Sequence, residues 1–279
     1  MSQALARIQV VEFSGADVQA FAHAQFSSDV NQLKIGDWQW SAWLDASGRV
    51  RNTFALLRAD ADRLLAWLPL GDAEVLVSAL RTFIFRSKVT IAAMQDYWLF
   101  SSTETANDLL CSASARWILD MPGPTRRSGA IVKDSANHVT DDEGFRQWRR
   151  DDIAAGLAWI DSEVSAQFTP QALGLQQFGA ISIDKGCYPG QETVARLHFR
   201  GGNKRERAHL RFTTASAPAP GESIRIDTQV PATGKILYSV VDPSGLCDAL
   251  AIVPIALDEN APLSLPNVAS LARVPFKAI

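Results

Sequence analysis

The sequence has few cysteines, little net charge and no long apolar run. Its 279 residues contain three cysteines, Cys111, Cys187 and Cys247, which are far apart and form no CxxC pair. A sparse and odd set does not indicate a disulfide framework, so we expect a reducing compartment and a cytoplasmic protein. The first twenty residues contain acids as well as Arg7, and no apolar run there is long enough for a signal peptide or a membrane span. We therefore expect no membrane association.

The common signatures of metal and nucleotide sites are also missing. Basic and acidic residues nearly balance, 27 against 30, which argues against a general coat for nucleic acid or anionic membranes. The four histidines show no HxxH or HExxH spacing, and three cysteines cannot supply four thiolates. No GxxxxGK[ST] loop or nucleophile elbow occurs. We therefore predict that the chain builds no metal site of its own.

Apolar residues make up 47% of the chain, enough for one large domain or two ordinary ones. Their spacing predicts strands and helices in the first part of the chain. Strands are expected over residues 7–13, 38–44, 50–58, 64–68 and 88–101. Helices are expected over residues 16–26, 72–85, 104–115 and 144–156. In the second helix, the expected buried face carries Val75, Leu76, Ala79, Leu80 and Phe83.

The pattern of predicted secondary structure changes after about residue 203. Short β-rich runs then alternate with Pro/Gly turns, at residues 208–213, 223–226, 234–241 and 249–254. This pattern predicts an α+β protein with two parts. Residues 1–203 would form an α+β body, which could consist of two interleaved subdomains, and residues 204–279 a small antiparallel β-barrel.

The string KGCYPGQE is the most informative segment. Gly186 and Gly190 bracket Cys187, so the backbone can turn sharply and another molecule can approach it. Pro189 suits the first position of the helix expected next, which places the thiol beside a helix N-terminus and close to Lys185. Both positive influences favour the thiolate, as a nucleophile or redox site requires. The alternative is a buried and inert thiol, as most free cysteines are.

A basic stretch follows this loop. Between residues 196 and 211 there is a single acid, Glu206, among six basic residues. These are Arg196, Arg200, Lys204, Arg205, Arg207 and Arg211. Such a cluster can hold an anionic ligand tail or RNA phosphates, and the alternative is a solvated face with scattered salt bridges.

The loop resembles the K-G-C-Y-x-G-Q-E signature of the YgfZ family, which is similar overall to the T-protein of the glycine cleavage system. The run from residue 148 to residue 205 fits the central block of the family almost throughout. Shorter matches occur at residues 24–30, 44–49 and 87–91. The resemblance therefore covers residues 1 to about 210.

The resemblance implies a T-protein-like folate-binding body, tetrahydrofolate as the ligand, and a C-terminal β-barrel. One of two tryptophans that contact folate in the family maps onto Trp148, although a helical tryptophan is most often a core residue. The other falls at Ile8, and Trp38, Trp40 and Trp43 are candidates to compensate. The loop residues expected to act are Cys187, Lys185, Tyr188, Gln191 and Glu192. The residues expected to bind folate are Trp148, Gly186, Gly190, Arg200, Lys204 and Arg205.

Three functions follow from these observations. The first is a folate-dependent accessory protein that supports iron–sulfur enzymes, their assembly or repair, and tRNA methylthiolation, with Cys187 facing a cavity shaped for a reduced pterin. The second is a one-carbon (aminomethyl) transferase, which needs a carboxylate near the reactive folate nitrogen. The third is a module that binds tRNA or a partner protein through the basic stretch. Whether the chain is an enzyme stays open at this point.

Overall fold

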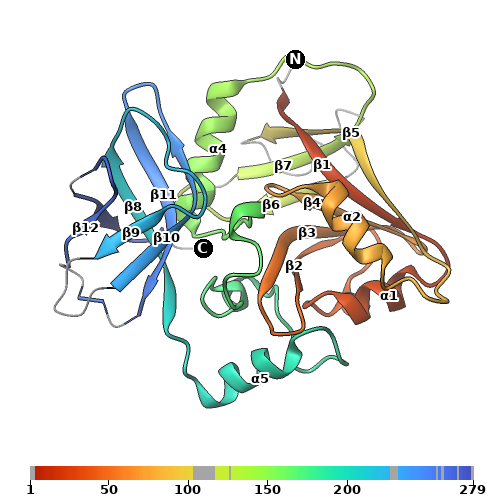
Figure 1. Cartoon of the computed structure of the whole chain (residues 1–279). Coiled ribbons are helices and arrows are strands. Elements are labelled where there is room, and N and C mark those ends of the chain that lie inside the picture. Colours follow the sequence, from red (N-terminus) through yellow and green to blue (C-terminus); the bar gives the residue numbers. More distant parts are fainter. Residues whose placement is uncertain are drawn as a thin grey trace.

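The computed structural model describes residues 4–102, 117–125, 127–226, 232–255, 257–258, 261–268 and 270–277. Two antiparallel sheets dominate these residues, with helices packed beside and between them (Figure 1). The α+β class predicted from the sequence is confirmed. The helix expected over residues 104–115 lies outside the described residues.

The first sheet has seven strands, and all of its described pairings are antiparallel. The strands are β1 (Ala4–Ser14), β2 (Trp38–Leu44), β3 (Val50–Asp60), β4 (Arg63–Leu68), β5 (Thr90–Ser102), β6 (Trp117–Met121) and β7 (Arg127–Lys133). Their order across the sheet is β2-β3-β4-β1-β5-β7-β6. Strands β4 and β1 therefore lie side by side, and residues 7–9 of β1 and the end of β4 form one wall of the site described below.

Both faces of this sheet are buried, because successive side chains of a strand point to opposite faces. In β3, Phe54 and Leu56 pack with α1 (Val18–Gln25) and α2 (Ala73–Arg81). The alternate residues Ala55 and Leu57 belong to the core on the other side. The apolar residues at consecutive positions of β3 thus reflect a strand that is buried on both faces of the sheet.

Helix α2 corrects one prediction. It begins after Asp72, whose side chain accepts hydrogen bonds from the backbone N–H groups of residues 74 and 75. Leu76 and Leu80 are buried as expected, but Val75 and Phe83 are 63% and 47% exposed. The helix ends at Arg81, before the predicted end at residue 85, so Phe83 is not on its buried face.

The second sheet is open, so the predicted closed β-barrel is wrong. Its six strands are β8 (Arg205–Thr213), β9 (Ser223–Ile226), β10 (Ala232–Val241), β11 (Leu246–Pro254), β12 (Leu263–Ser264) and β13 (Ala272–Val274). In the order β12-β9-β10-β11-β8-β13, the two shortest strands form opposite edges and do not pair with each other. Such short edge strands offer few groups for closure, which a barrel requires along every strand.

Helix α4 (Asp142–Ala155) lies between the two sheets, whereas α5 (Gln191–Arg200) lies at the far end of the molecule (Figure 1). Arg150 of α4 contacts Asp242, with Nη1 3.0 Å from Oδ2, and Asp248, with Nη2 2.9 Å from Oδ2. Both acids belong to the second sheet or the turn that follows β10. These ion pairs fix α4 against the second sheet while its other side faces the first.

Candidate functional site

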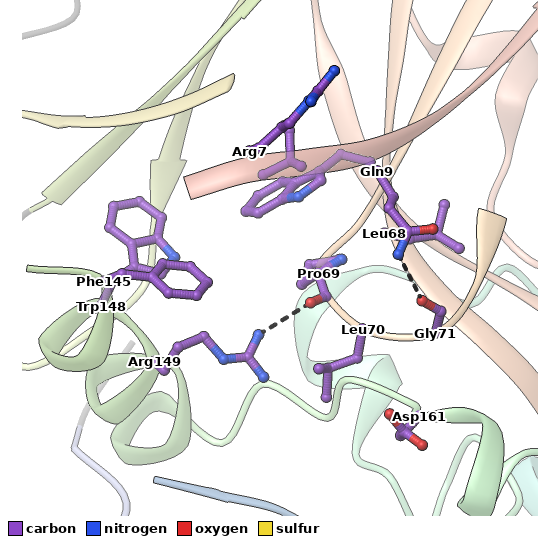
Figure 2. Close-up of a pocket in the computed structure, with 12 residues that line it drawn as sticks. Arg7, Gln9, Leu68, Pro69, Leu70, Gly71, Phe145, Trp148, Arg149 and Asp161 are labelled. Carbon is purple, nitrogen blue, oxygen red and sulfur yellow. Dashed lines mark hydrogen bonds between the residues drawn. The ribbon is translucent and has the colours of Figure 1, made fainter. Parts of the chain in front are cut away.

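A cavity of about 200 Å³ lies where α4 meets the first sheet. Figure 2 shows Phe145, Trp148 and Arg149 projecting from α4 on one side, with Arg7 and Gln9 on β1 opposite them. The loop between β4 and α2 closes the remaining side. The twelve lining residues are Arg7, Ile8, Gln9, Trp67, Leu68, Pro69, Leu70, Gly71, Phe145, Trp148, Arg149 and Asp161.

Local signals place α4 and therefore Trp148. The Asp141 side chain caps the helix by accepting a hydrogen bond from the Gly144 N–H at 2.8 Å. Gly156 ends the helix in the left-handed conformation, with φ of 74°, as a C-terminal glycine commonly does. The Trp148 ring packs closely on Gly129 of β7, where an added Cβ would lie 3.0 Å from the Trp148 Cη2. The tryptophan is only 3% exposed, so it is a core residue that also lines the cavity.

Trp67 is the lining residue that sequence reasoning missed. It lies in the cavity together with Ile8, whereas Trp38, Trp40 and Trp43 are not among the lining residues. Trp67 is 2% exposed, and its indole N–H has no hydrogen-bond partner among the described residues. The alternation of β4 placed Trp67 on one face of the sheet, but the sequence alone did not indicate that this face borders a cavity.

Charged and polar groups surround the aromatic lining. Arg149 is largely buried, and its guanidinium lies over the ring of Tyr238 at 4.7 Å and 3.5 Å from the Pro69 carbonyl oxygen. The exposed Arg7 donates a hydrogen bond to the carbonyl of residue 95 at 2.5 Å. Gln9 holds the β4–α2 loop, since its Oε1 accepts from the backbone N–H of residue 73 at 2.8 Å. The cavity therefore combines flat apolar faces with two cations.

Cys187 lies outside this cavity. Its side chain is exposed, and it is not among the twelve lining residues, contrary to the expectation that the sulfur faces the pterin cavity. Helix α5 begins at Gln191, with Gly190 as its N-cap, so Pro189 precedes the helix rather than occupying its first position. The thiol therefore belongs to a surface loop just before the helix.

The Lys185 side chain bonds to backbone carbonyls of another segment. Its ammonium donates hydrogen bonds to the backbone carbonyls of His23 and Phe26, and to that of Ser28 at 3.1 Å. These carbonyls lie at and beyond the C-terminal end of α1, where unpaired carbonyl groups need donors. Burial lowers the pKa of Lys185 to about 8, although Asp29 acts in the opposite direction. The contribution of Lys185 to the site is to fix the loop onto α1.

The other residues of the string have mostly structural contacts. Tyr188 is buried, its hydroxyl donates to the Ser182 carbonyl at 3.0 Å, and burial raises its pKa to about 12. The Gln191 amide donates to the carbonyl of Lys185 at 3.2 Å, which closes the loop on itself. Glu192 is exposed in the first turn of α5. Cys187 is thus presented by a loop that its neighbours hold in place.

The two glycines of the loop differ. Gly190 has a φ of 77°, and an added Cβ would lie 2.5 Å from both the Gly48 Cα and the Asp45 carbonyl oxygen. Gly186 is exposed, and an added Cβ there would lie 3.9 Å from His23 Nε2, its nearest neighbour. Only at Gly190 does the packing require a glycine.

The basic residues predicted to bind folate are not brought to this cavity. Arg200 and Lys204 are exposed, and Arg205 donates to the backbone carbonyl of Thr233 at 3.1 Å. None of the three lines the cavity with Trp148. A ligand in the cavity would instead meet Arg149 and Arg7. Arg200 ends α5, at the opposite end of the molecule from the start of α4 (Figure 1).

Two further findings concern only the part of the chain that the structure describes. No group of three or more His, Cys, Asp or Glu side chains is placed to hold a metal ion. Among the helices, none is both long enough and apolar enough to cross a membrane.

Comparison with known proteins gives close relatives and a similar fold. No family model matches the chain. The chain is 34% identical over 237 residues to the tRNA-modifying protein YgfZ of Klebsiella pneumoniae (strain 342), covering 76% of this chain and 72% of the relative. It is 31% identical over 273 residues to the protein of that name from Escherichia coli O127:H6, covering 88% and 82%. The crystal structure of glycine cleavage system aminomethyltransferase T from Bartonella henselae has the same fold, with a TM-score of 0.70 at 16% identity, covering 98% of this chain and 84% of that one.

Proposed function

The chain belongs to the YgfZ family of tRNA-modifying proteins, and we propose that it is a cytoplasmic folate-binding accessory protein. In this proposal, tetrahydrofolate occupies the cavity between α4 and the first sheet. Cys187 is the reactive group of a separate surface loop. Together they support iron–sulfur cluster assembly or repair in client enzymes, and through these enzymes tRNA methylthiolation.

The unpaired indole N–H of Trp67 is the observation that carries the folate proposal. A buried donor without a partner costs free energy, about 1–3 kcal/mol, unless a ligand or water accepts its hydrogen bond. Trp148 and Phe145 add flat aromatic surface to the same cavity. A pterin offers both a flat ring system and acceptor atoms at its edge, so these residues fit it.

The size of the cavity defines which part of folate it would hold. About 200 Å³ is below the roughly 300–1,000 Å³ of pockets that enclose whole drug-sized ligands. The pterin end would therefore be enclosed and the rest of the molecule would extend outward. The bound folate would supply the one-carbon or redox chemistry of a reduced pterin. The protein would stack the ring on Trp148 and donate a hydrogen bond from Trp67.

The exposed position of Cys187 supports contact with a partner. Its loop is held by Lys185 and Tyr188, so the sulfur is presented in a defined place on the surface. An exposed thiol can reach a cluster or a sulfur atom held by another protein. An iron–sulfur enzyme or an assembly protein would then be the partner, and tRNA would be affected indirectly.

A tetrahydrofolate titration tests the ligand. Calorimetry and tryptophan fluorescence with wild type should give saturable binding, and Trp148→Ala should weaken it by about tenfold or more, which is about 1.4 kcal/mol. Trp67→Phe removes the N–H and keeps an aromatic ring, and it should also weaken binding. Trp38→Ala, outside the cavity, serves as the control. If Trp148→Ala and Trp67→Phe are folded by circular dichroism and still bind tetrahydrofolate with wild-type affinity, the proposal is contradicted.

A complementation experiment tests the thiol. Cys187→Ser should fold normally and fail to restore tRNA methylthiolation in a strain that lacks the protein. Cys247→Ser changes a buried thiol and should complement if it folds. Full activity of Cys187→Ser would remove the thiol from the proposal.

A one-carbon transferase is the second candidate. Asp161 lines the cavity and is the one carboxylate among its twelve lining residues. A carboxylate near a folate nitrogen is what general acid–base catalysis of one-carbon transfer requires. Folate-dependent formaldehyde release that is lost in Asp161→Asn would favour this candidate over the accessory protein.

A further inference from the structure

A second cavity of about 220 Å³ also borders the β4–α2 loop. It is formed by β2, β3, α2 and the segment after residue 161. The lining residues are Trp43, Arg51, Asn52, Gly71, Asp72, Val75, Leu76, Ala79, Ser162 and Ser165. None of the residues proposed to hold the pterin by stacking or by an unpaired N–H belongs to it.

This second cavity contains hydrogen-bond donors that the described protein does not use. Trp43 is 4% exposed, and its indole N–H has no hydrogen-bond partner among the described residues. The guanidinium of Arg51 lies 5.1 Å from the centre of the Trp43 ring and forms no ion pair or hydrogen bond with any described residue. A buried unpaired N–H beside a free cation favours a ligand with negatively charged acceptor oxygens.

The acid and the hydroxyl groups in this cavity have other partners. Asp72 Oδ1 accepts hydrogen bonds from the N-terminal N–H groups of α2, at 2.8 and 3.2 Å. The Ser165 hydroxyl donates to the Arg51 carbonyl at 3.1 Å, and the Ser162 hydroxyl donates to Asp161 at 3.2 Å. Of the groups discussed, the Arg51 guanidinium and the Trp43 N–H therefore remain available to a ligand, and both are hydrogen-bond donors.

The two cavities have a common boundary at Gly71. This glycine lines both of them, and the adjacent residues Asp161 and Ser162 line one cavity each. Gly71 has a φ of 92°, and an added Cβ would lie 3.2 Å from the Asn52 Nδ2 and 3.3 Å from the Ile160 carbonyl oxygen. A side chain at residue 71 would therefore be crowded, and the two cavities meet at a position that has none.

We propose that the second cavity binds the carboxylate end of the folate, with Arg51 as the residue that recognises the tail. This inference rests on the proposed function. Folate has an anionic glutamate end joined to its pterin by a linker, and the two cavities match these two ends in chemistry. Arg51 pairs with a tail carboxylate, Trp43 donates its N–H to the same group, and the linker crosses Gly71.

Calorimetry with two ligands separates the tail from the pterin. The ligands are tetrahydrofolate, which has the carboxylates, and 6-methyltetrahydropterin, which has no tail. Arg51→Ala should weaken tetrahydrofolate binding by about tenfold or more, which is about 1.4 kcal/mol, and leave binding of the tail-less pterin unchanged, because only tetrahydrofolate has a carboxylate for Arg51 to pair with. Trp43→Phe keeps the ring and should weaken only tetrahydrofolate.

Arg86→Ala is the matched control. Arg51 and Arg86 are both exposed arginines, but Arg86 lines neither cavity. The Arg86→Ala variant should bind both ligands as wild type does. Equal affinity of wild type and Arg51→Ala for tetrahydrofolate would overturn the inference while leaving pterin binding intact. Equal affinity of wild type for tetrahydrofolate and 6-methyltetrahydropterin would also overturn the inference, because the tail would then add nothing to binding. If wild type bound neither ligand, the proposed function would fail, and the inference with it.

Discussion

Arg127 of β7 and Asp152 of α4 form a buried ion pair, with Nη2 2.5 Å from Oδ1. The guanidinium also lies 4.4 Å from the centre of the Trp148 ring and donates to the Trp148 carbonyl oxygen at 2.9 Å. Asp152 accepts a second hydrogen bond from the Trp159 indole at 2.9 Å. One ion pair thus joins the first sheet to the helix that carries the wall of the candidate folate cavity.

Removal of Asp152 should destabilise the protein strongly. Asp152→Ala leaves the Arg127 charge buried without its partner, which typically costs about 3–5 kcal/mol. Urea unfolding followed by circular dichroism measures this loss of unfolding free energy. The control Asp62→Ala changes an exposed acid and should stay within about 0.5 kcal/mol of wild type. Equal stability of the two variants would show that the ion pair has no structural role.

The two glycines around Cys187 should respond differently to alanine. Gly190→Ala forces a side chain into the Gly48 turn at a positive φ, and we expect a loss of about 1–3 kcal/mol in unfolding free energy. Gly186→Ala meets no close neighbour and should change stability by about 0.5 kcal/mol or less. Thermal unfolding of both variants checks this order, and a reversed order would contradict the packing described for the loop.

Lys185 should make stability depend on pH. Burial lowers its pKa from 10.5 to about 8 in the folded protein. Between these values the unfolded chain binds more protons than the folded one, so the unfolding free energy contributed by Lys185 rises from about pH 8 to about pH 10.5. The stability difference between wild type and Lys185→Met should therefore move in favour of wild type across this window. Urea unfolding at pH 7.5 and 9.5 measures it, and a constant difference would argue against the buried ammonium.

The described cysteines should differ in accessibility. Cys187 is exposed, whereas Cys247 is fully buried, and burial raises the pKa of the Cys247 thiol to about 12. Iodoacetamide at pH 8 should therefore label Cys187 in the native protein and Cys247 only after unfolding in urea. Peptide mapping by mass spectrometry distinguishes the sites. Labelling of Cys247 at a comparable rate in the native state would contradict the structure.

Much of the fold could be predicted because its signals are local. Strand alternation located β1 to β4 to within a few residues, and the helix predicted over residues 144–156 is found as α4 (Asp142–Ala155). The string around Cys187 also identified the family. Strands β6 and β7 were not predicted, because Pro122, Gly123 and Pro124 interrupt the pattern between them.

The sequence by itself thus determined the class, most elements and the family, since backbone propensity and periodicity depend on near neighbours. Only the tertiary structure decided that the second sheet stays open, that Trp67 borders a cavity and that Lys185 bonds to carbonyls near Ser28. These outcomes depend on contacts between residues far apart in the chain. A side-chain pattern shows that a face is buried, but the packing of the whole chain decides what covers that face.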